Sequence, residues 1–200
     1  MVLLHPYNPN DPQTNLCTQH LVLTTKQTYR SLIMPNWITN EVTFTHDNPH
    51  KLEEMADIFR NEEPFNHLIP QPDWPNIPAK EDIKGYNGET IAKKGELPEK
   101  EVWKSGETHW NWPSSGRQDD RWYDWRCRNW GCKWDIWDVE VDYQKAGNLV
   151  HLTFNTPWCP PDPIYEKLCD MGYEFLMWEW QDECEEEVHD LVPIPVEVRA

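Results

Sequence analysis

The sequence lacks any apolar run long enough to cross a lipid bilayer, and its first residues lack the charged start and extended apolar segment of a signal peptide. Its six cysteines form no C-x-x-C pair and have no structural-zinc spacing, which favours free thiols over a metal centre. Cations are scarce, because 18 Lys and Arg stand against 35 Asp and Glu, and the formal net charge is −17. This charge argues against nucleic-acid partners and anionic membrane surfaces.

Aromatic residues are abundant although the apolar fraction is only 38%. The densest stretch, Asp119 to Asp135, holds four of the thirteen tryptophans. The spacing of its aromatic residues predicts a helix over 120–129 that ends at Gly131, followed by a strand with alternating apolar residues. These large side chains would fill a core in few pieces, so the stretch is informative about architecture and not about chemistry.

The remaining periodicity predicts two further helices and four strands. The expected strands are 38–45, 134–143, 150–154 and 173–180, and the expected helices are 49–60 and 162–171. This order predicts an α+β fold, a ferredoxin-like βαββαβ sandwich with an antiparallel sheet of strand order 4-1-3-2. A long Pro/Trp-rich insertion follows the first helix.

Three segments make up the predicted domain organisation. Residues 1–33 form an N-terminal arm or extension, 34–181 form the ferredoxin-like domain with its insertion at 64–118, and 182–200 form an acidic C-terminal tail. In the central hairpin, a β-bulge near Ile136 would place Trp134 across from Trp158 as an aromatic pair.

The sequence offers no convincing catalytic, cofactor or metal site. Cys127, Cys132 and Cys159 have no identifiable partner histidine, so we expect no enzymatic activity. The fold is shared with RNA-recognition modules, yet the expected open face carries Glu41 and almost no cations, which disfavours RNA. The carboxylates of the edge strand could hold a cation, although a solvated strand face is the simpler interpretation: Asp138, Glu140 and Asp142.

Of the functions considered, protein binding is the one that the sequence does not disfavour. Two tryptophans of the last strand have the alternation expected of the open face, and a dense acidic run follows them. An apolar patch beside negative charge suits a basic partner protein, while the alternative is a merely solvated tail. The predicted partner-binding residues are Trp178, Trp180, Asp182, Glu183, Glu185, Glu186 and Glu187.

Three strings, MPNWITN at 34–40, NWGCKWD at 129–135 and NTPWCPP at 155–161, resemble those of the YubB-like ferredoxin-like proteins. That family, of unknown function, is carried by conjugative plasmids and tailed phages. The resemblance implies the same fold and a mobile-element origin, and it brings no catalytic residues. The sequence thus predicts a non-enzymatic accessory protein in the host cytoplasm that binds a host or viral protein, as an acidic nucleic-acid mimic or defence inhibitor. The alternative is a structural or assembly component of the virus particle.

Overall fold

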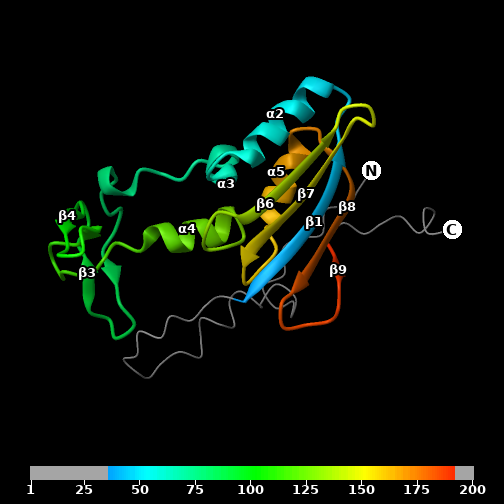
Figure 1. Ribbon diagram of the computed structural model, residues 1–200. Helices are drawn as coiled ribbons and strands as arrows, with labels where there is room; N and C mark the ends of the chain where they lie inside the picture. The colour runs from blue at the N-terminus through cyan, green and yellow to red at the C-terminus, as the bar shows by residue number, and fades with distance from the viewer. Residues whose placement is uncertain (1–35, 192–200) are drawn as a thin grey trace, which may run out of the picture.

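The computed structural model describes residues 36–191, in which a five-stranded antiparallel sheet carries helices on one face (Figure 1). The strands of this sheet lie in the order β6-β7-β1-β8-β9. Their bounds are β1 Trp37–Thr45, β6 Trp137–Gln144, β7 Leu149–Pro157, β8 Glu174–Asp182 and β9 His189–Asp190. The helices are α2 Pro49–Arg60, α3 Pro64–Leu68, α4 Arg121–Asn129 and α5 Asp162–Asp170. The predicted N-terminal arm and the end of the predicted tail lie outside the described residues.

The α+β class holds, but the prediction of a four-stranded βαββαβ ferredoxin-like sandwich is wrong. The sheet has a fifth strand, because the chain turns back after β8 and β9 pairs with Glu179 and Trp180. The region predicted as an insertion also adds α3, a short 3-10 helix at Trp74–Asn76 and two small hairpins. These hairpins pair β2 Ile83–Lys84 with β3 Thr90–Ala92, and β4 Glu99–Val102 with β5 Thr108–Asn111.

The sheet buries one face, called the covered face below, against α2, α3 and α5. Alternate residues of β1 and β7 point into this core, as the sequence alternation predicts. Helix α2 contributes Leu52, Met55, Ala56 and Phe59, and α5 contributes Ile164 and Leu168. The largest fully buried side chains include Trp130, Trp178, Phe44, Phe59, Phe65 and Phe154.

Gly131 ends the tryptophan-rich helical stretch, as predicted. Its φ is +83°, and a Cβ there would come within 2.9 Å of Pro163 Cδ and 3.1 Å of the Pro160 carbonyl oxygen. Only glycine fits this conformation and this close approach. The preceding Trp130 is therefore held in the core, where its Nε1 donates a hydrogen bond to the Ile69 carbonyl at 2.9 Å.

The hairpin register agrees with the prediction near the turn and departs from it near the bulge. A turn at 145–148 predicts that Tyr143 lies opposite Val150, and the structure confirms this pair. The bulge falls between Trp137 and Glu140, slightly later than predicted, and Asp138 takes a φ of +56°. The alternation of Trp137, Val139, Val141 and Tyr143 in the sequence predicts that Trp137 faces the core. This prediction is wrong, because the extra residue reverses the side of Trp137, and 68% of its surface is exposed.

Residues 74–118, called the side lobe below, extend away from the sheet (Figure 1). The lobe has a small core of its own, in which Trp112 packs with Ala79, Ile91 and Ala92. Arg121, at the start of α4, contacts two tryptophans of the side lobe. Its guanidinium lies 5.1 Å from the Trp74 ring centroid and 4.6 Å from that of Trp112. The same guanidinium donates to both carboxylate oxygens of Asp119. The apolar residues of the insertion predict that it packs against the domain through Phe65, Ile69 and Trp74. Phe65 is fully buried in the main core and Ile69 packs against that core, whereas Trp74 contacts Arg121 instead.

Candidate functional site

The predicted docking patch is not formed, because Trp178 lies on the covered face. It is 1% exposed and packs against Phe154, Tyr165 and Phe175. Its Nε1 donates to Asn40 Oδ1 at 3.2 Å. The predicted exposure of Trp178 is wrong because β8 contains a bulge. Phe44 lies opposite Phe175 while Thr43 lies opposite Met177, so Leu176 is an extra residue and the alternation of side chains reverses there.

Trp180 is half-buried rather than presented to a partner. Its ring stacks on His189 of β9, with centroids 4.3 Å apart and an interplanar angle of 23°. His189 Nε2 also lies 3.4 Å from the Glu185 carboxylate. The tryptophan therefore holds the short strand β9 against β8.

Of the predicted acidic residues of the tail, Asp182 ends β8, and the other four lie in an exposed turn that connects β8 to β9. The turn begins on the sheet, because the Glu183 N–H donates to the Trp37 carbonyl at 3.0 Å and Asp182 Oδ1 accepts from the Cys184 N–H at 2.8 Å. Glu185, Glu186 and Glu187 are exposed beyond it. The run is thus anchored at both ends, and β9 returns its last carboxylate, Asp190, to the sheet.

The opposite face of the sheet, called the open face below, carries a row of carboxylates. Glu41 on β1 lies directly opposite Glu179 on β8, and Glu179 lies opposite Asp190 on β9. On the other side, Thr153 separates Glu41 from Glu140 on β6. Directly opposite residues have Cβ atoms about 5 Å apart, and like charges at that spacing destabilise a sheet. The row is therefore a feature that stability alone does not favour.

The five strands of this sheet, as the structure describes them, contain no Lys or Arg. Asp142 lies beside it, opposite His151. Trp137 shares the open face, because it lies opposite Asn155, whose Oδ1 accepts from the Thr39 hydroxyl on the same face. The open face thus combines an exposed indole with several carboxylates, the combination predicted for the other edge of the sheet.

Sequence reasoning placed Glu41 and Glu140 on the open face but missed Glu179, Asp190 and Trp137. Each omission traces to a bulge or to β9, since one extra residue moves every following side chain to the other face. The sequence of β8 does contain a sign of its bulge. Apolar residues occupy both alternating sets of positions in this strand, which is typical of a strand that contains a bulge or is buried on both faces.

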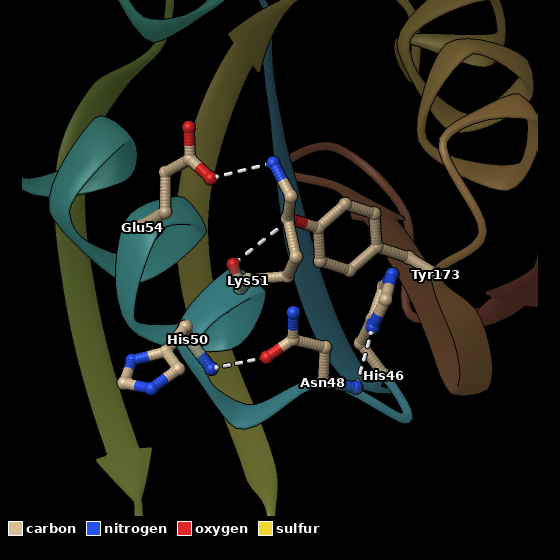
Figure 2. Close-up of polar contacts among 6 residues, drawn as sticks. All are labelled: His46, Asn48, His50, Lys51, Glu54 and Tyr173. Carbon is tan, nitrogen blue, oxygen red and sulfur yellow. Dashed lines mark hydrogen bonds and ion pairs between the residues drawn. The ribbon is translucent and has the colours of Figure 1, made fainter.

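A polar cluster at the start of α2 has a structural role (Figure 2). Asn48 Oδ1 accepts from the His50 N–H at 3.0 Å, the usual N-cap contact, and His46 Nδ1 accepts from the Asn48 N–H at 2.9 Å. The Tyr173 hydroxyl donates to the Lys51 carbonyl at 2.9 Å. Burial raises the pKa of Tyr173 to about 12. These contacts join the β1–α2 corner to the α5–β8 corner, and the tyrosine remains protonated at physiological pH.

Other possible chemical sites are poorly developed. No group of three or more His, Cys, Asp or Glu side chains within residues 36–191 is arranged to hold a metal ion. Cys132 is buried, and its thiol donates to the Trp134 carbonyl at 3.2 Å. A shallow hollow of about 270 Å³ lies between the end of α2 and β6. It is lined by Phe59, Arg60, Asn61, Glu62, Val139 and Val141.

The three strings that carry the family resemblance meet at one end of the sheet. The Trp158 N–H donates to the Asn36 carbonyl at 2.9 Å, and buried Asn40 donates through Nδ2 to the Thr156 hydroxyl at 3.0 Å. Thr156 in turn donates to the Cys159 carbonyl at 2.8 Å. These contacts satisfy buried polar groups and fix the ends of β1 and β7, so the strings are explained at least in part by structure.

Comparisons with protein-family models, with curated proteins and with solved structures found no match. No helix in the described part of the chain has the length and apolar character needed to cross a bilayer.

Proposed function

We propose that this protein is a non-enzymatic accessory protein of a phage or plasmid that binds a basic protein through the open face of its sheet. The single observation that carries the proposal is the row Glu140, Glu41, Glu179 and Asp190, which runs across the sheet without a Lys or Arg in the described strands. Such a row suits a surface rich in lysine and arginine, including one that otherwise binds nucleic acid.

Trp137 gives this surface an apolar anchor. Interface hot spots are enriched in tryptophan, and an indole exposed over 68% of its surface gains much by burial against a partner. The exposed glutamates of the turn between β8 and β9 extend the negative field beyond Asp190. The tail residues therefore stay in the proposal as a flank of the surface, with Trp137 in the place first given to Trp178.

Charge distribution in the rest of the chain supports the choice of this face. Lys and Arg concentrate in the side lobe and α4, with Lys84, Lys93, Lys94 and Lys100 in the lobe. From Trp134 to Leu191 the only Lys or Arg residues are Lys145 and Lys167. The protein would therefore approach a basic partner in the host cytoplasm with its sheet first, since the field of the whole molecule orients the encounter.

The test compares two triple variants with the same change in charge. Glu41→Gln, Glu140→Gln and Glu179→Gln neutralise the open face, whereas Glu53→Gln, Glu81→Gln and Glu166→Gln neutralise exposed residues of α2, the side lobe and α5. With poly-L-lysine as the probe at low salt, the first triple should weaken binding at least about tenfold more than the second. Equal weakening would mean that only net charge matters, and would contradict the assignment of the surface.

A further inference from the structure

Three aromatic rings surround the ammonium group of Lys133. Its Nζ lies 4.5 Å from the ring centroid of Trp134, 5.4 Å from that of Trp158 and 5.6 Å from that of Tyr123. The rings come from separate parts of the chain: Tyr123 from α4, Trp134 from the connection to β6, and Trp158 from the residue after β7. We call these three rings the aromatic cage.

The cage is held in place by the fold. Trp134 and Trp158 contact each other with ring centroids 5.8 Å apart, which confirms the predicted pairing of these two residues. Trp158 has a φ of +66°, a conformation that bulky residues adopt only when their surroundings impose it. Its backbone N–H is fixed by the Asn36 carbonyl. The surrounding structure therefore fixes the position of the Trp158 indole. The rings of Tyr123, Trp134 and Trp158 are each half-buried, so solvent reaches all three.

The rings hold the Lys133 ammonium without help from a carboxylate. Within residues 36–191, no Asp or Glu oxygen lies within 4 Å of Nζ, although the protein carries a formal net charge of −17. Two indoles and a phenol around an ammonium are the arrangement by which proteins bind choline-like and methylated-lysine groups. Methylation favours such a site further, because an alkylated ammonium is less strongly hydrated than that of lysine.

We propose that Tyr123, Trp134 and Trp158 form a binding site for an alkylammonium group, in which Lys133 is a resident and displaceable occupant. The site goes beyond the proposed protein-binding function and is independent of the open face. Lys133 competes from within the chain at high effective concentration, so the native protein binds an external ammonium weakly. A partner that engages the adjacent surface, or a ligand with a permanently alkylated nitrogen, would replace the lysine side chain.

The experiment titrates Lys133→Ala and the native protein with tetramethylammonium chloride, against sodium chloride at equal ionic strength. Binding is followed by the indole N–H signals in nitrogen-edited NMR spectra, assigned with Trp134→Phe and Trp158→Phe. Both indole signals should shift and saturate in Lys133→Ala, with an affinity at least about tenfold above that of the native protein. Lys145→Ala, a lysine in the β6–β7 turn, is the matched control and should behave as native.

A second arm replaces the salt with a short peptide that contains one trimethylated lysine. Tighter binding of the peptide would identify a protein side chain as the source of the ammonium, and equal binding would identify a free quaternary amine. Lys133→Thr serves as the second variant if Lys133→Ala does not fold. The absence of a saturable shift in the folded variant, or the same response after Trp158→Ala is added to it, would overturn the proposal and leave Lys133 as a structural contact only.

Discussion

The two faces of the same sheet follow different rules. On the covered face, Val42 lies between Leu152 and Trp178, and all three are almost fully buried. On the open face one residue along, Glu41 lies between Thr153 and Glu179, where like charges oppose each other. The residues of the covered face are therefore explained by their contribution to stability, whereas the carboxylates of the open face lower the stability of the sheet. Residues that cost stability and stay exposed are the ones that a binding role best explains.

The largest expected effect is the loss of stability when a large side chain on the covered face is truncated, compared with a truncation on the open face. Trp178→Ala should lower the free energy of unfolding by about 3–5 kcal/mol, because it leaves a cavity in the core and removes the partner of Asn40 Oδ1. The adjacent Met177→Ala, on the open face, should cost much less. Chemical denaturation measures both, and similar losses would show that the faces are assigned wrongly.

The next effect concerns a polar residue in the same core. Asn40→Ala should cost about 1–3 kcal/mol, because it leaves the buried Trp178 Nε1–H without its acceptor and removes the hydrogen bond that the Thr156 hydroxyl oxygen accepts. Asn155 is the matched control, since it is the same residue type on the neighbouring strand and its side chain accepts an exposed hydrogen bond from the Thr39 hydroxyl. If Asn155→Ala destabilises the protein as much as Asn40→Ala, the buried network is not what holds the end of the sheet.

A smaller effect of opposite sign is expected on the open face. Glu41→Gln should raise the free energy of unfolding by about 0.5 kcal/mol at low salt, because it removes repulsion from Glu179. Added salt should remove most of the gain. Thermal unfolding at two ionic strengths measures this difference, and a loss of stability would mean that Glu41 has a favourable contact in the free protein.

The smallest expected effect is a pH dependence of the free energy of unfolding, caused by the half-buried carboxylate of Asp135. Burial raises the pKa of Asp135, even though its oxygens accept the N–H groups of Phe65 and Asn66 at the start of α3. The folded state therefore binds this proton more tightly than the unfolded state, so the contribution of Asp135 to stability grows as pH falls toward about 4 and is lost as pH rises.

Asp135→Asn should remove that slope. The difference in unfolding midpoint between the native protein and this variant should increase in favour of the native protein as the pH falls from 7 toward about 4. A difference that is constant with pH would show that the buried carboxylate does not titrate in this range.

The sequence predicted individual elements better than their arrangement. The alternation of β1 and the Asn48-Pro49 start of α2 are local signals, and both are confirmed. The fifth strand escaped detection because β9 has two residues and is held by the Trp180–His189 stack rather than by any sequence period.

The proposed docking surface could not be placed from sequence because it depends on two bulges. A single extra residue at Leu176 buries Trp178, and another at Asp138 exposes Trp137. Bulges change which side chain faces solvent without changing composition, so a prediction by alternation is reliable only up to the first one. The sequence predicted an apolar and acidic patch on β8; the structure has such a combination on the open face around Trp137 and Glu41, and its role in binding is a proposal.

The most direct measurement maps where a basic ligand touches the protein. A lysine decapeptide titrated into isotopically labelled protein should shift the backbone amides of β1 and β8 around Glu41 and Glu179, and the indole N–H of Trp137. Adding salt should reverse these shifts. Shifts confined to α2, α5 or the Glu185–Glu187 turn, with Trp137 unchanged, would contradict the account that the open face is the binding surface.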